Sequence, residues 1–186
     1  MHGMNDEVNM RRYGGLAKYM PITAITFGLG YLAIIGVPPF AGFYSKDKLI
    51  EVALNAGGAK GYLFGGAALI GAAITAFYMS RVVILTFLSN KRWDDNAHPH
   101  ESPILMWLPM AILAIGSVAS GYLFTKGDAL KNWLEPVVAS HGEGERAELL
   151  PPTTVSVLAL TLVAIGVAIA IMKYRAESNP NSPENV

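Results

Sequence analysis

The sequence contains no cysteine among its 186 residues. A chain without thiols cannot form a disulfide scaffold, a thiolate zinc site, a cysteine-bound iron–sulfur cluster or a thiol nucleophile. The formal net charge is zero and the sequence pI is about 6.9, so the chain offers no broad basic surface for nucleic acid. We therefore expect no nucleic-acid partner and none of these cysteine-dependent sites.

Charged residues are also scarce. They make up 15% of the chain, and hydrophobic residues make up 52%, whereas an ordinary soluble domain carries roughly 25% charged residues. The mean hydropathy is +0.37. Because so little polar surface cannot cover a globule of this size in water, the composition indicates a membrane protein whose first partner is the lipid bilayer.

Charges are missing altogether from four long stretches. Each of these stretches has at least the roughly 20 residues that a helix, rising about 1.5 Å per residue, needs to cross a hydrocarbon core of about 30 Å. A lipid-facing backbone must satisfy its hydrogen bonds within its own segment. The sequence therefore predicts an all-α, polytopic transmembrane helical bundle. The stretches run from Tyr19 to Ser45, from Gly61 to Ser80, from Ser102 to Thr125 and from Leu149 to Met172.

The apolar pattern divides the chain into three parts. We expect a polar amino-terminal loop over residues 1–20, a transmembrane region over 21–175 and a disordered tail over 176–186. The first apolar run begins too late for a cleaved signal peptide, so none is expected. The predicted helices lie at about 22–37, 62–88, 104–124 and 153–172, with a broken or half-helix at 40–57.

The half-helix follows a proline pair. Pro38 and Pro39 lack amide hydrogens and restrict the residue before them, which ends a helix. Ser45 suits a helix cap, Asp47 suits the positive end of that helix, and Gly57 suits its exit. The bundle then has five crossings if the broken piece spans the membrane and four if it does not. Orientation stays open, because the positive-inside rule favours a cytoplasmic amino terminus only for five crossings.

The span at 62–88 is rich in small residues at a spacing of four. Such spacing lets helix backbones approach closely, so we expect this span to be a packing centre. The residues are Gly61, Gly65, Ala68, Ala72 and Ala76.

Lys46 and Asp47 are the first candidates for chemistry, because they follow the break in an apolar stretch. Broken helices near the membrane midplane build ion sites in transporters, and a dry cavity favours the neutral form of a lysine. A lysine that loses and regains a proton can relay protons. The alternative places Lys46, Asp47 and Lys48 in a loop in headgroup water.

Arg81 is a single charge inside its predicted span. If the span is centred as drawn, Arg81 lies within the hydrocarbon and needs an internal partner such as Asp47 or Glu51. If the span is shifted toward Gly61, Arg81 snorkels at the interface. The sequence leaves both positions open.

Two further patterns do not support a site. His98, His100 and Glu101 lie in a polar loop, and this spacing supplies too few metal ligands with no fixed geometry. Gly28, Gly30 and Ala33 match the letters of a dinucleotide fingerprint, but no strand precedes them. We therefore expect no metal site and no cofactor bound by this chain.

Four strings, in order, resemble the carboxy-terminal half of the L subunit family of bacterial NADH:quinone oxidoreductase, respiratory complex I, the counterpart of mitochondrial subunit 5. The resemblance covers roughly residues 2 to 175. The core of the second string is shared with cation/proton antiporter and membrane hydrogenase subunits. The strings are MRRYGGLAKYMPIT (10–23), IIGVPPFAGFYSKDKLIE (34–51), AFYMSRVVILTF (76–87) and HPHESPILMWLPMAILAIGSVASG (98–121).

This resemblance implies a proton-pumping, antiporter-like subunit in the inner cell membrane. It also implies other membrane-arm subunits as partners, with NADH and quinone bound by those other subunits. The family's broken helix carries a lysine–aspartate pair that matches Lys46 and Asp47, and Arg81 also matches a family position. Family members are several times longer, so the chain resembles a fragment or a split gene product.

Two alternatives stay open. The chain resembles, by the same motif, a subunit of a multisubunit sodium/proton antiporter or of a membrane hydrogenase, which would work without NADH. An isolated short chain can also be a packing or assembly module without transport activity.

Overall fold

The structure is a computed structural model, and it describes residues 2–94, 96–126, 132–134, 136 and 151–177. Within these ranges the regular structure is helical and no strand occurs, which confirms the predicted all-α class. The main elements are α1 (Pro21–Ile35), α2 (Ala41–Asn55), α3 (Gly58–Val83), the π-helical turn η4 (Ile84–Leu88), α4 (Ile104–Thr125) and α6 (Pro152–Glu177). Residues 178–186 of the predicted tail lie outside the described residues.

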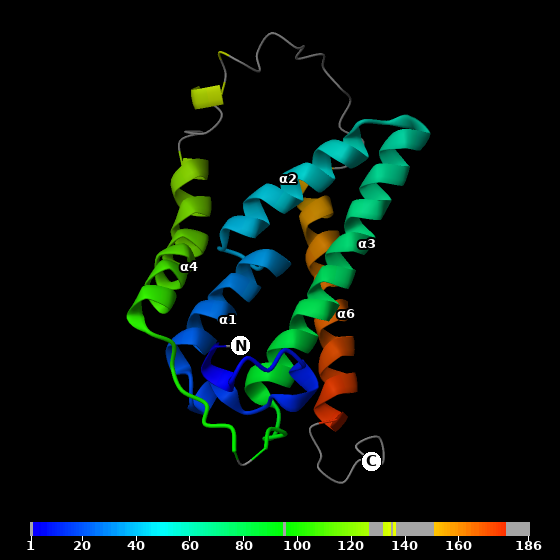
Figure 1. Ribbon diagram of the computed structural model, residues 1–186. Coiled ribbons are helices and arrows are strands. Elements are labelled where there is room, and N and C mark those ends of the chain that lie inside the picture. The colour runs from blue at the N-terminus through cyan, green and yellow to red at the C-terminus, as the bar shows by residue number, and fades with distance from the viewer. Residues whose placement is uncertain (1, 95, 127–131, 135, 137–150, 178–186) are drawn as a thin grey trace.

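Among the described residues, three helices are long and apolar enough to cross a membrane by length and composition: Gly58–Leu88, Ile104–Thr125 and Pro152–Arg175. Helix α1 has only 15 residues, or about 22 Å at about 1.5 Å per residue. Figure 1 shows α1 and α2 following one another in the same general direction, after which α3 returns antiparallel to them. The broken helix therefore consists of α1 and α2 in series, rather than of α2 alone beside a complete first span.

The break lies where the proline pair predicts it. Helix α1 ends at Gly36, whose φ of 82° is in the left-handed region that glycine favours. The Gly36 N–H donates to the Ala33 carbonyl at 3.2 Å, and the Val37 N–H donates to the Leu32 carbonyl at 3.1 Å, which closes the helix end. Pro38 and Pro39 follow, and α2 begins at Ala41.

The starting cap of α2 differs from the prediction. Helix α2 begins four residues before Ser45, and Ser45 donates its hydroxyl to the Ala41 carbonyl from inside the helix. Asp47 is therefore in the second turn of α2 and not in its first. The helix starts early because the residues after the prolines, Ala41 to Tyr44, are compatible with helix. The predicted exit is right, since Gly57 follows α2 with a φ of 72°.

The small residues of α3 form the packing centre that their spacing predicts. Gly61, Gly65, Ala72 and Ala76 are all buried. Helix α3 packs along α6 (Figure 1), and a Cβ placed on Gly166 of α6 would lie 2.5 Å from the Ala73 carbonyl oxygen. The backbones of α3 and α6 are therefore in close contact.

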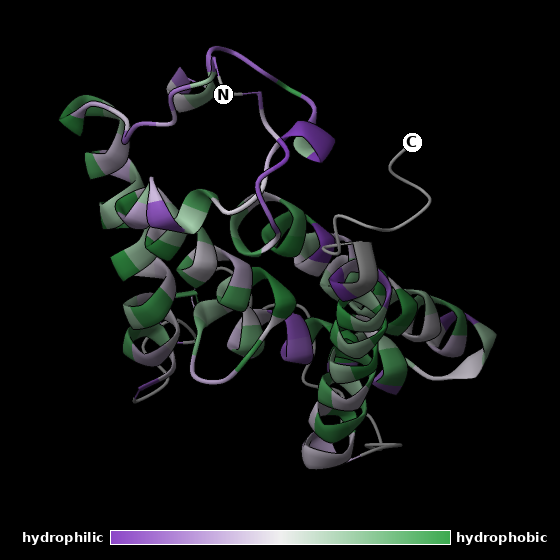
Figure 2. Cartoon of the chain, turned by 90° about the horizontal axis from the view of Figure 1, so that it is seen from below, coloured by the Kyte–Doolittle hydropathy of each residue, from purple (hydrophilic) through white to green (hydrophobic). Residues whose placement is uncertain are grey.

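The amino-terminal segment is more ordered than a polar loop. It contains three short 3-10 turns, at His2–Met4, Met10–Arg12 and Leu16–Lys18. Met4, Tyr13 and Leu16 are buried against Phe87 at the end of η4. The backbone N–H of Asn9 also holds the pKa of Glu7 below its ordinary value. Figure 2 shows hydrophilic residues gathered in this segment, while the long helices are largely hydrophobic.

Candidate functional site

The proline break places the Lys46 amine against the end of α1. Its Nζ donates to the Ile34 carbonyl oxygen at 3.2 Å. This carbonyl belongs to the last turn of α1, where helix carbonyls have no partner within the helix and carry partial negative charge. Lys46 is half-buried, so the amine has a polar partner from another element while one side of it stays open.

Two glycines bring the helix ends close enough for this contact. A Cβ on Gly42 would lie 1.8 Å from the Ala33 carbonyl oxygen, and a Cβ on Gly36 would lie 3.7 Å from Lys46 Cδ. Position 42 therefore excludes any side chain as long as α1 and α2 keep this approach. The lysine stem then crosses the junction beside Gly36.

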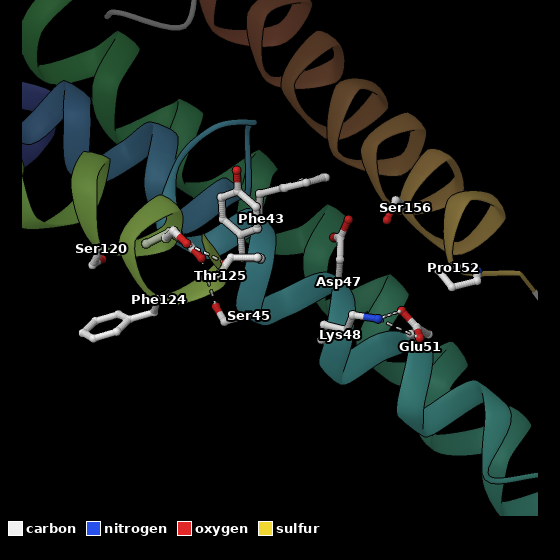
Figure 3. A pocket seen from close by; sticks show the side chains of 13 residues that line it. Phe43, Ser45, Asp47, Lys48, Glu51, Ser120, Phe124, Thr125, Pro152 and Ser156 are labelled. Atoms are coloured by element: carbon white, nitrogen blue, oxygen red, sulfur yellow. Dashed lines mark hydrogen bonds and ion pairs between the residues drawn. The ribbon is translucent and has the colours of Figure 1, made fainter. Parts of the chain in front are cut away.

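Asp47 points to another side of α2. It is only 8% exposed, and no described residue forms a hydrogen bond with its Oδ2. Figure 3 shows its carboxylate and the Ser156 hydroxyl of α6 pointing toward one another. Lys46 and Asp47 form no salt bridge within 4.0 Å, since the ion pairs of the described residues are Arg12–Glu7 and Lys48–Glu51.

A second charged pair lies one turn further along α2. The Lys48 Nζ donates to both Glu51 oxygens, at 3.0 and 2.9 Å, as Figure 3 shows. The Lys48 side chain is 68% exposed and the Glu51 side chain is 14% exposed. The alternative that placed 46–48 in a loop is wrong, because all three residues lie within α2.

Arg81 contacts an aromatic ring and neither of the two carboxylates considered in the sequence analysis. Its guanidinium carbon lies 5.3 Å from the centre of the Tyr174 ring of α6, and Tyr174 is buried. The alternative in which Arg81 snorkels at the interface stays a prediction. Arg81 makes no salt bridge with Asp47 or Glu51, the internal partners that a centred span would need. The physical reason is position: α2 meets α3 at the start of α3, whereas Arg81 lies near its end.

The sequence missed the role of Glu101. Its carboxylate accepts hydrogen bonds from the Ile22 backbone N–H and from the Thr23 hydroxyl, so it caps the first turn of α1. The ring of His100 packs edge-on against His2, with centroids 5.8 Å apart. The three residues that match the letters of a dinucleotide fingerprint, Gly28, Gly30 and Ala33, lie inside α1. In the sequence, the signal for the start of α1 at this point was Pro21, a residue typical of the first helical turn.

Chemically, the arrangement offers an amine and a carboxylate that are neighbours in sequence and face different surroundings. The amine can give up and regain a proton beside a helix end. The carboxylate is shielded and has one oxygen without a described partner. The amine and the carboxylate are therefore candidates for proton exchange, and their placement depends on α1, α2 and α6 together.

Comparison with known proteins gives a consistent result. Residues 1–89 match the family described as NADH:quinone oxidoreductase/Mrp antiporter, TM. The chain is 57% identical over 174 residues to NADH-quinone oxidoreductase subunit L of Mycobacterium tuberculosis, a match that covers 94% of this chain and 27% of that protein.

More distant relatives carry similar names. NAD(P)H-quinone oxidoreductase chain 5 of Picosynechococcus sp. is 36% identical over 207 residues, covering 94% of this chain and 30% of the relative. NADH-quinone oxidoreductase subunit L of Rhodobacter capsulatus is 39% identical over 160 residues, covering 77% and 22%. The chain thus spans between 22% and 30% of the length of these three curated relatives.

Proposed function

Because the chain belongs to the family of NADH-quinone oxidoreductase L subunits, we propose that it forms the part of a proton-translocating membrane-arm subunit in which protons pass through Lys46 and Asp47. The observation that carries this proposal is the Lys46 amine, which reaches across the proline break to the Ile34 carbonyl. The buried Asp47 next to it supplies a second proton acceptor.

In this mechanism Lys46 takes up a proton from one side and passes it on from the other. The remaining part of the longer subunit covers the open side of Lys46 and delivers protons to it. Charge changes elsewhere in the membrane arm alter the proton affinity of the amine, which drives uptake and release. Asp47 adjusts that affinity through its own charge.

The proposed setting follows from the family. The chain works in the cell membrane together with other membrane-arm subunits, and those partners couple translocation to NADH oxidation by quinone. NADH, quinone and the redox groups are bound by other subunits. The chain itself supplies no redox centre in this proposal, so it contributes to a translocase without carrying out electron transfer.

Two substitutions at one position test the relay. In the complete subunit within its native membrane, Lys46→Met should lower the number of protons translocated per NADH oxidised. Lys46→Arg keeps the positive charge, but a guanidinium is not deprotonated in proteins, so it should lower the ratio as well. Proton uptake by inverted vesicles, measured against NADH oxidation, gives this ratio.

The matched control is Lys60→Met, which removes an exposed lysine at the start of α3 and should leave the ratio unchanged. A normal ratio in Lys46→Met vesicles would remove Lys46 from the proton path. A lowered ratio in Lys46→Met together with a normal ratio in Lys46→Arg would mean that Lys46 supplies only a fixed positive charge.

A second candidate function is supported by the matched family, whose description also includes Mrp antiporters. In that case the same Lys46–Asp47 pair exchanges protons for sodium without NADH. A sodium gradient imposed on vesicles that lack NADH distinguishes the two: proton movement that depends on Lys46 under these conditions favours the antiporter.

A further inference from the structure

A cavity of about 560 Å³ lies between α2, α4 and α6. Apolar side chains such as Phe43 and Phe124 form part of its wall, and polar groups from all three helices line the rest (Figure 3). The cavity is large enough for several waters, and its polar side chains can form hydrogen bonds with them. The polar lining residues are Ser45, Asp47, Lys48, Glu51, Ser120, Thr125 and Ser156.

We propose that this cavity is the aqueous compartment through which Asp47 exchanges protons, and that Glu51 is a further proton carrier between Asp47 and bulk water. The inference rests on the proposed proton-translocating function and extends it. It assigns one side of the path to the cavity and a chemical role to a residue outside the Lys46–Asp47 pair.

Asp47 is the group that connects the cavity to the lysine. Asp47 is 8% exposed and lines the cavity, and no described residue hydrogen-bonds to its Oδ2. A buried polar atom without a protein partner is normally satisfied by water. Lys46 does not line the cavity and contacts the end of α1 instead. In this proposal a proton that leaves Lys46 toward the cavity passes by way of Asp47, its neighbour in α2.

Glu51 lies in the right place to continue the path. It is four residues after Asp47, which puts the two carboxylates on one face of α2, roughly 5–6 Å apart at Cβ. Both line the cavity. The exposed Lys48 contacts both Glu51 oxygens, so Glu51 is the carboxylate that lies between the buried Asp47 and the exposed ammonium group.

The transfer is balanced as a sequence of O–H exchanges. Protonated Asp47 gives its proton to a water in the cavity, and the Glu51 carboxylate accepts a proton from the other end of the hydrogen-bonded waters. Glu51 then releases that proton to bulk water and returns to the carboxylate. No electron moves, and no co-reactant is consumed.

Water access to the cavity can be tested directly, because the chain has no cysteine of its own. Ser156→Cys, a nearly isosteric change in the cavity wall, should react with a charged, membrane-impermeant thiol reagent in the assembled complex. Val155→Cys is the matched control, since Val155 is 1% exposed and packs with Ile50 and Leu54. It should stay unlabelled, and no labelling of Ser156→Cys would overturn the aqueous compartment.

The role of Glu51 is tested by its dependence on Lys46. Glu51→Gln should lower the proton-to-electron ratio to the level of Lys46→Met, and the double variant should be no lower. Glu51→Asp should restore most of the ratio, because a carboxylate remains. Glu7→Gln, at the amino-terminal segment, is the control glutamate and should leave the ratio normal.

The outcomes separate the two proposals. A normal ratio in Glu51→Gln with a lowered ratio in Lys46→Met would overturn the role of Glu51 and leave the relay intact. A normal ratio in both would overturn the proposed function. Additive losses in the double variant would place Glu51 outside the path. If Glu51→Gln prevents assembly, the labelling of Ser156→Cys and the ratio in Glu51→Asp decide the proposal.

Discussion

The Glu101 carboxylate joins two segments that are 79 residues apart in the chain, through its hydrogen bond with the Ile22 N–H. Helix α1 starts with Pro21, which has no N–H of its own, and has no capping side chain at Met20. The first N–H of α1, that of Ile22, therefore depends on a carboxylate from the loop before α4. The negative charge of Glu101 also interacts favourably with the positive end of the helix.

Replacing Glu101 with Ala should loosen the first turn of α1. Loss of a capping acceptor typically costs about 1 kcal/mol, which corresponds to a roughly fivefold change in an opening equilibrium. Hydrogen–deuterium exchange measured by mass spectrometry should show faster exchange in the peptide that contains Ile22 and Thr23. Glu101→Gln keeps an acceptor oxygen and should have a smaller effect, and His98→Ala should have none.

Unchanged exchange in Glu101→Ala would mean that Pro21 and packing alone hold the turn.

The sequence could not reveal this cap, because the acceptor and the donors are distant in the chain and only tertiary structure brings them together. Arg81 illustrates the same limit. Its position inside a span left two predictions open, an internal carboxylate partner or snorkelling at the interface, and neither identified the ring of Tyr174 that Arg81 contacts.

At the scale of elements, the sequence specified the break in the helix and left its geometry open. Two consecutive prolines end a helix wherever they occur, so the boundary between α1 and α2 could be predicted. The early start of α2, before Ser45, could not be predicted from capping preference. Because Ala41 to Tyr44 are compatible with helix, α2 begins directly after the prolines and Ser45 lies inside it.

The approach of α2 to α1 predicts a strong effect of a single methyl group. Gly42→Ala would place a Cβ 1.8 Å from the Ala33 carbonyl oxygen, so the helix ends must separate. Overpacking of this kind costs about 1–3 kcal/mol. The unfolding transition of the purified protein in detergent, followed by circular dichroism, should shift to lower temperature.

Gly30→Ala is the matched control for this substitution. Gly30 also lies in the broken helix, but no atom outside its own helix turn comes within 4 Å of a Cβ placed there. Alanine is better than glycine inside a helix by about 1 kcal/mol, so this variant should be as stable as the parent chain or more stable. Equal behaviour of the two variants would show that α1 and α2 are not packed this closely.

For the whole molecule, the order of elements places both described ends at the same end of the bundle (Figure 1). Helices α1 and α2 run one way, α3 returns, and α4 and α6 repeat the alternation. The apolar stretches predicted these helices well, because spanning length and composition are local properties. The number of crossings was left at four or five, since no local pattern shows whether two short helices are joined end to end.

This arrangement predicts a labelling pattern for single cysteines in oriented vesicles. If α1 and α2 form one crossing, Val8→Cys and Asn96→Cys should react with an impermeant maleimide from one side, and Ala59→Cys from the other. If α1 and α2 each cross the membrane, Val8→Cys and Ala59→Cys should share a side instead. The buried Ala72→Cys is the unreactive control.

The Lys46 amine and the Asp47 carboxylate serve different neighbours only because adjacent residues of a helix are turned by about 100° from one another. Inserting one residue into the first turn of α2 would rotate everything after it, presenting Ser45 to the end of α1 and the amine to Ser156. The number of residues between Gly36 and Lys46 thus determines which side chain reaches the end of α1, and a one-residue insertion there would turn the amine toward Ser156 and Asp47 away from it.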